Sequence, residues 1–154
     1  MKFIAVVAAL ATTALAQSIA IGVPAAGSNI FPGESLNVEV DLPQTLTGTR
    51  EVAIAIGLLS CNQFGGDCGN IDVSQDLGTI LFSGDYNPQL SDPSKPPFQH
   101  FSVPVPVSLP IGTASLNVAH FSLVGAGPEA FFEVKNITLN VVPGPSVAGR
   151  RLIL

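Results

Sequence analysis

Basic residues are scarce in this sequence, and charged residues of either sign are few. Lys and Arg number 6 against 11 Asp and Glu in 154 residues, and charged residues make up 11% of the chain. Two of the six, Arg150 and Arg151, lie close to the C-terminus. Phosphate backbones and anionic lipid headgroups repel such an acidic body, which argues against a nucleic-acid-binding protein. The 47% of apolar residues argues equally against a disordered chain.

Tryptophan, tyrosine and catalytic motifs are also nearly absent. The chain has no Trp and one Tyr, Tyr86, which weakens the case for a glycosidase or a carbohydrate-binding module. No Gly-x-Ser-x-Gly nucleophile elbow occurs. Of the two histidines, His100 and His120, the second lies on the apolar face of a predicted strand, which is typical of a core or boundary residue. We therefore expect no enzymatic activity and no cofactor.

Long hydrophobic runs are missing, apart from a short one near the N-terminus. Lys2 precedes eight apolar residues, 3–10, and Ala14-Leu15-Ala16 has the pattern of a signal-peptidase site. A membrane span needs about 20 apolar residues, so this run is too short for one, and no later stretch is longer. The sequence predicts a signal peptide over residues 1–16, a secreted, extracellular mature protein that begins at Gln17, and no membrane span.

Cysteine is limited to one pair, Cys61 and Cys68, which enclose a loop containing two glycines. In a secreted chain such a pair predicts a disulfide. A zinc site would need about four Cys and His ligands, and no others lie nearby in the sequence. The oxygen-rich residues that follow do not have the spacing of a calcium-binding loop, so we expect no metal. Those residues are Asp67, Asn70, Asp72 and Asp76.

Beyond residue 17, apolar residues alternate with small or polar ones at a period of two, which is typical of half-buried strands. We predict strands over residues 19–23, 36–40, 52–58, 77–83, 101–107, 113–124 and 131–142. About seven short strands with Gly/Pro turns and no amphipathic helix indicate an all-β immunoglobulin-like or fibronectin-like β-sandwich. The sandwich domain is expected to span residues 17–142, and residues 143–154 form a flexible C-terminal tail.

The alternation also predicts particular positions within the two sheets. Pro104 and Pro106 place their strand at a sheet edge, because proline cannot donate a ladder hydrogen bond. Phe132 and Val134 are out of phase with the apolar residues that follow, which indicates a β-bulge near Lys135. The residues expected in the core are Val52, Ile54, Ile56, Leu116, Val118, Ile137 and Leu139.

Two motifs indicate processing of the secreted chain. Asn136-Ile137-Thr138 is an N-glycosylation sequon, and the alternation places Asn136 on an outward face. The sequon is either glycosylated or unused. The pair Arg150-Arg151 is either a dibasic processing site or incidental.

Five segments of the sequence resemble a known family. They are EVAIAIG (51–57), LGTIL (77–81), LPIG (109–112), LNVAHFSLVGA (116–126) and NITLNV (136–141). In them the chain is similar to the necrosis-inducing secreted protein family of small fungal effectors. Residues 60–76, which contain the cysteine pair, have no counterpart in this resemblance.

The resemblance implies a non-enzymatic role. Members of that family bind plant immune-receptor-associated kinases, suppress immunity or trigger host cell death, so host proteins are the expected partners. Two alternatives remain open at this point: an extracellular or cell-wall binding module without a host role, and an unrecognised hydrolase or metalloprotein. The sequence leaves the oligomeric state open.

Overall fold

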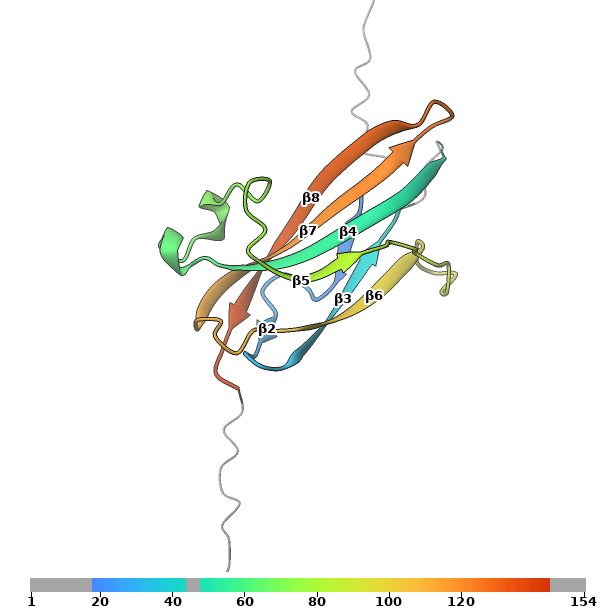
Figure 1. Cartoon of the computed structure of the whole chain (residues 1–154). Coiled ribbons are helices and arrows are strands. Elements are labelled where there is room, and N and C mark those ends of the chain that lie inside the picture. The colour runs from blue at the N-terminus through green and yellow to red at the C-terminus, as the bar shows by residue number, and fades with distance from the viewer. Residues whose placement is uncertain (1–17, 44–47, 145–154) are drawn as a thin grey trace, which may run out of the picture.

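The computed structural model describes residues 18–43 and 48–144. The predicted signal peptide, Arg150-Arg151 and most of the predicted tail lie outside these residues. Within them the chain is all-β, with eight strands in two sheets rather than the seven expected (Figure 1). The additional strand, β2, is only two residues long, too short for any alternation to reveal it.

The smaller sheet has three antiparallel strands in the order β1-β3-β6. Their bounds are Ala20–Val23 for β1, Ser35–Asp41 for β3 and Phe98–Pro104 for β6. β6 lies at the edge of this sheet, as Pro104 and Pro106 predict. On the opposite edge, the pairing of β1 with β3 is shifted between Ile21 and Val23.

The larger sheet has five strands in the order β2-β8-β7-β4-β5. The bounds are Asn29–Ile30 for β2, Thr49–Ser60 for β4, Thr79–Gly84 for β5, Gly112–Val124 for β7 and Glu129–Val141 for β8. β7 and β8 form a hairpin of two 13-residue strands that pair without any register shift. The bulge predicted near Lys135 is therefore wrong. β2 runs parallel to β8 and pairs with it at Asn140 and Val141.

Apolar side chains from both sheets form one core between them. Val38, Val40, Phe101 and Val103 from the smaller sheet pack there with residues of β4, β7 and β8. The predicted core members Ile54, Ile56, Leu116, Val118 and Leu139 are buried, and Ile137 packs against them. Val52 does not belong to this core, because the register of β4 shifts between Glu51 and Ala53, and Val52 is 36% exposed.

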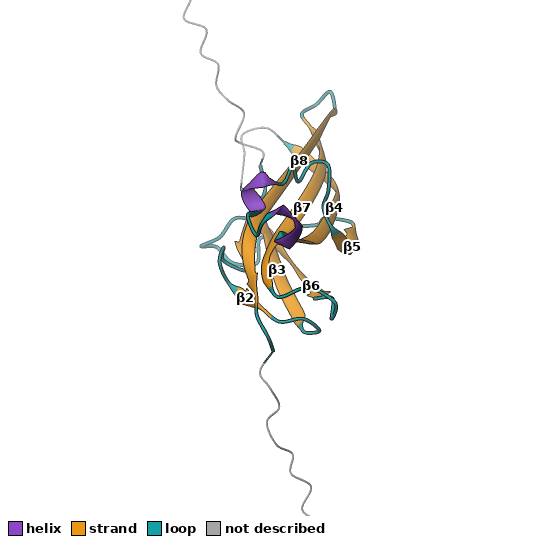
Figure 2. Cartoon of the chain, turned by 90° about the vertical axis from the view of Figure 1, so that its left-hand side faces the viewer, coloured by secondary structure: helices purple, strands orange, loops and turns teal. Residues whose placement is uncertain are grey.

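The loop between β4 and β5 lies over the outer face of the larger sheet (Figure 2). It carries two short 3-10 helices, η2 (Asn62–Phe64) and η3 (Cys68–Asn70), both in contact with β7. The Leu77 carbonyl accepts a hydrogen bond from Asn117 Nδ2 at 3.1 Å. The same carbonyl approaches Gly57 so closely that a Cβ there would lie 2.3 Å from it, so β4 needs a glycine at this position.

Candidate functional site

The larger sheet has two ends of opposite character. We call residues 56–60, 112–118 and 135–141 the disulfide end, and residues 49–55, 119–124 and 129–134 the hairpin end (Figure 1). At the disulfide end the inner face is apolar, with Leu116 and Leu139 fully buried. At the hairpin end the inner face instead carries His120, Ser122 and two glutamates. The candidate functional groups therefore gather at the hairpin end.

His120 lies at the centre of a buried charge cluster. Its side chain is 0% exposed, and its Nε2 bonds to the carboxylate of Glu51 on β4. Its Nδ1 lies 3.2 Å from Glu133 Oε1 on β8. Glu133 also accepts hydrogen bonds from the Ile19 backbone N–H at 2.8 Å and from the Ser18 hydroxyl at 2.6 Å. The cluster thus ties three strands to the segment that precedes β1.

The pKa values of His120 and Glu133 favour their charged forms. Burial lowers the pKa of His120, but the hydrogen bonds to Glu133 and Glu51 outweigh that effect and raise the pKa from 6.5 to about 9. Burial tends to raise the pKa of Glu133, but the hydrogen bonds from His120, Ser18 and Ile19 lower it below its usual value. At neutral pH His120 is therefore an imidazolium beside the Glu133 carboxylate, with Glu51 bonded to its other ring nitrogen.

This arrangement is suited to holding strands together rather than to acid–base chemistry. Both ring nitrogens of His120 are occupied, so neither is left to take a proton from a bound molecule. Tyr86 packs edge-on against the ring at 5.4 Å, and its hydroxyl donates to the Val40 carbonyl at 3.1 Å. The alternation places His120 in the core correctly. Glu51 and Glu133 were missed, because they lie on other strands, 69 and 13 residues from His120, and nothing in the sequence marks them as its partners.

A second buried carboxylate, Glu39, lies on the outer face of the smaller sheet. Lys95 Nζ is 2.8 Å from Glu39 Oε1, and His100 Nε2 is 3.2 Å from Oε2. Burial and the neighbouring Glu39 raise the pKa of Asp41. A Cβ at Gly22 would lie 2.7 Å from oxygens of both carboxylates, so the glycine at this position leaves room for them. This cluster anchors the proline-rich segment before β6 to the sheet.

The predicted residues of the cysteine loop have local, structural contacts. Cys61 and Cys68 are joined in a disulfide with Cα atoms 5.2 Å apart. Asp67 accepts from the N–H of Gly69, Asp72 from that of Ser74 and Asp76 from that of Gly78. Each carboxylate thus caps its own turn. Among the described residues, no three His, Cys, Asp or Glu side chains are arranged to hold a metal ion.

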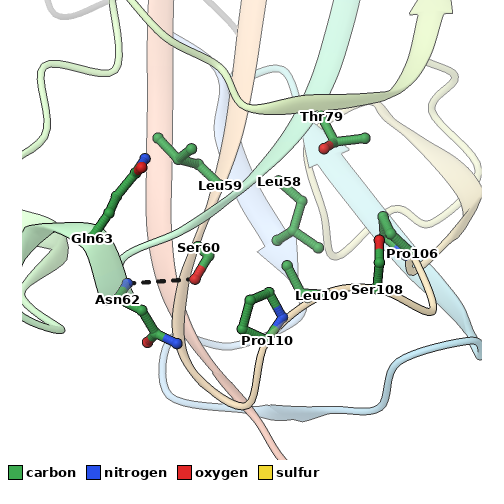
Figure 3. A pocket seen from close by; sticks show the side chains of 10 residues that line it. All are labelled: Leu58, Leu59, Ser60, Asn62, Gln63, Thr79, Pro106, Ser108, Leu109 and Pro110. Atoms are coloured by element: carbon green, nitrogen blue, oxygen red, sulfur yellow. Dashed lines mark hydrogen bonds between the residues drawn. The ribbon is translucent and has the colours of Figure 1, made fainter.

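A cavity of about 360 Å³ opens between the end of β4 and the turn that precedes β7 (Figure 3). Leu58, Leu109, Pro106 and Pro110 supply much of its lining. Its polar lining residues are Ser, Thr, Asn and Gln, and none of the lining side chains is ionisable. The cavity can accept an apolar group, but its lining has no ionisable side chain that could act as an acid or a base.

The outer face of the hairpin end is apolar and uncovered by the cysteine loop. Phe121 pairs with Phe132 across β7 and β8, and Ala119 pairs with Val134. Phe132 is 61% exposed. At the border with the disulfide end, Asn136 is exposed on the outer face, and its Nδ2 lies 3.4 Å from Ser115 Oγ. The sequon is thus accessible, although it lies within a regular strand.

Comparison with known protein families matches the sequence to the Nis1 family over residues 14–140. The chain belongs to the Nis1 family. This is a fungal effector-like family, in agreement with the resemblance found in the sequence. A search of curated proteins gives no match for the chain. Within the described residues, no helix is long and apolar enough to cross a membrane.

Proposed function

We propose that this Nis1-family protein is a secreted, non-enzymatic effector that binds host proteins, namely plant immune-receptor-associated kinases, and thereby suppresses immunity or triggers cell death. The observation that carries the proposal is the family match over residues 14–140. A disulfide, compatible with an oxidising, extracellular environment, supports the secreted location. The buried histidine cluster, whose ring nitrogens are both occupied, favours binding over catalysis.

The surface at the hairpin end supports a protein partner over a carbohydrate. Its exposed aromatic residue is Phe132, whereas Tyr86 is buried with its hydroxyl bonded to the backbone. Phenylalanine has no polar group to orient a sugar, but an exposed phenylalanine on an apolar sheet face suits a protein interface.

We also infer an immunoglobulin-like topology for the sandwich. The order β1-β3-β6 opposite β8-β7-β4 corresponds to strands A-B-E facing G-F-C of that fold. β2 adds a short parallel pairing beside β8, and β5 extends the sheet beyond β4. An experimental structure that showed a different strand order would overturn this inference.

The proposed function is tested with the mature protein and purified kinase domains of plant receptor-associated kinases. Isothermal titration calorimetry should show saturable binding at micromolar concentrations or tighter, and expression in leaf tissue should suppress the response to a microbial elicitor. A receptor kinase domain without a role in immunity serves as the control. Absence of binding together with an undiminished immune response would contradict the proposal, and sedimentation with chitin, glucan or cellulose would then support a cell-wall binding module.

A further inference from the structure

The edges of the two sheets differ in how well they are protected against pairing with another chain. β6 ends at Pro104, β1 has four residues with a register shift, and β5 has six residues with a shift in its pairing to β4. Prolines, short strands, bulges and charged side chains are the usual means of protecting an edge. β8 has no proline and no register shift along its 13 residues, and its charged residues are Glu129, Glu133 and Lys135.

The free edge of β8 lies on the side away from β7. β2 occupies only one end of this side: Asn140 N–H donates to the Ser28 carbonyl at 2.9 Å, and the Thr138 carbonyl accepts from Gly27 N–H at 2.7 Å. Backbone groups alternate sides along an antiparallel strand, so even-numbered residues of β8 direct theirs away from β7. Over the remaining length, the outward backbone groups have no backbone partner among the described residues. They belong to Ala130, Phe132, Val134 and Asn136.

The side chains of the same residues lie on the outer face of the sheet. Phe132 and Val134 face outward beside Phe121, with Phe132 61% exposed. Four unpaired backbone positions in a row, flanked by exposed apolar side chains, form the template that an incoming strand needs. On the other face of β8, Glu133 and Lys135 lie in contact with each other, at 3.5 Å.

We infer that residues 130–136 of β8 bind an extended segment of a partner protein as an additional strand. This segment presents apolar side chains on the face of Phe132 and Lys or Arg on the opposite face. The inference rests on the proposed function and specifies the surface and the partner chemistry. Main-chain hydrogen bonds supply affinity in such pairing, and alternate side chains supply specificity.

Charge selects a basic segment and disfavours a second copy of this chain. The described residues include eleven acidic side chains against three basic ones and the protonated His120, a net charge of about −7. Two of the three basic side chains, Lys95 and Lys135, are already within ion pairs. Along β8 itself, Glu133 is already paired with His120 and Lys135, so Glu129 is the exposed acidic residue that remains to attract a cation. A second copy would bring the same negative charge to the edge, whereas a basic segment is attracted to it.

Hydrogen exchange of backbone amides tests the inference directly. The probes are a plant receptor-associated kinase domain and a synthetic peptide of alternating Val and Lys, nine residues long. In the free protein the amides of Phe132 and Val134 should exchange quickly, whereas those of Phe131 and Glu133, paired with β7, are already slow. Bound probe should slow the first pair at least about tenfold and leave the second pair unchanged.

A variant supplies the second measurement. Val134→Pro removes one outward N–H without removing a bond to β7, and should weaken binding of both probes at least about tenfold. Ile80→Ser, at an exposed apolar position on β5, is the matched control and should bind normally. Circular dichroism checks that both variants are folded, and the exchange experiment needs no variant at all.

The outcomes separate this inference from the proposed function. Kinase binding without slowed exchange at Phe132 and Val134 overturns the β8 edge and leaves the effector role intact. Slowed exchange with the peptide but no kinase binding supports the edge and contradicts the proposed partner. No effect of either probe overturns the inference. Protection that instead grows with protein concentration, with a dimer in light scattering, also overturns it in favour of a second copy.

Discussion

The two ends of the larger sheet are built with opposite polarity. At the disulfide end, Leu116 and Leu139 face the core, while Ser115 and Asn117 face outward beneath the cysteine loop. At the hairpin end, His120 and the two glutamates face inward, while Phe121 and Phe132 face outward. The first arrangement is the usual one for two packed β-sheets, in which apolar burial provides stability.

The reversed polarity of the hairpin end indicates a functional demand. Burying an ion pair costs desolvation energy, and the attraction between the two charges does little more than offset that cost. Leaving Phe132 exposed forgoes burial that would stabilise the fold. An end that gives up stability on both faces is the part of the molecule where a binding role is expected.

Loss of the His120 imidazole should lower the stability of the hairpin end more than any other change considered. In His120→Ala, Glu51 and Glu133 remain buried without the histidine that both of them bond, so the free energy of unfolding should fall by about 3–5 kcal/mol. Urea unfolding, monitored by circular dichroism, measures this free energy of unfolding. Ser122→Ala is the control, because the buried Ser122 hydroxyl has no hydrogen-bond partner, and its removal should be nearly neutral. Equal stability of the two variants would mean that the cluster does not tie the strands together.

At the disulfide end a core truncation should act through packing alone. Ile56 is 0% exposed, and Ile56→Ala should lower the free energy of unfolding by about 2–5 kcal/mol through lost burial and the cavity left behind. Thr138→Ala, exposed on the outer face of β8, should change it by less than about 0.5 kcal/mol while removing the sequon. If the two variants unfold at the same urea concentration, the inner and outer faces have been assigned wrongly.

Stability should depend on pH through the hairpin end. The pKa of His120 is raised from 6.5 to about 9 by folding, so its contribution is complete below pH 6.5 and disappears as the pH rises through 9. The pKa of Glu133 is lowered from 4.5, so its contribution is present above pH 4.5 and disappears as the pH falls below that value. Urea midpoints measured from about pH 3 to pH 10 should therefore be highest between these limits. A His120→Gln variant should lose the alkaline decline, and a decline that persisted in it would assign the effect to another group.

Removing the disulfide should destabilise the disulfide end only modestly. The paired Cys61→Ser, Cys68→Ser variant frees a short loop, which should cost about 2–2.5 kcal/mol and leave the fold intact. Thermal unfolding of the mature protein with and without the bond measures this. Because the loop covers Asn117, faster amide exchange should be confined to the neighbouring outer face. If the variant were entirely unfolded, the loop would contribute more to the stability of the fold than covering the outer face of the sheet.

The difference between the two ends also explains what the sequence could and could not predict. Alternation identifies the core wherever apolar residues face inward, and it places Ile54, Leu116 and Leu139 correctly. The same rule fails for Phe132 and Val134, because it assumes that apolar side chains are buried and so requires a bulge that β8 does not have.

Contacts between residues distant in the sequence were beyond the reach of that reasoning. His120 contacts Glu51 and Glu133, 69 and 13 residues away, and only the pairing of β4, β7 and β8 brings them together. Glu39 likewise meets Lys95 across 56 residues. The cysteine pair was predictable because it is the only pair in a chain expected to be secreted. Most of the segments that resemble the family lie on strands, where the alternation is plain.

The most direct test of the functional role of the hairpin end measures binding and stability in the same preparations. Phe132→Ser and the control Ile80→Ser each replace an exposed apolar residue on the outer face. Calorimetry with a receptor-associated kinase domain and urea unfolding give the two quantities. The account predicts that Phe132→Ser weakens binding at least about tenfold while changing the free energy of unfolding by less than about 0.5 kcal/mol, and that Ile80→Ser changes neither. Unchanged binding by Phe132→Ser, or equal losses in both variants, would contradict it.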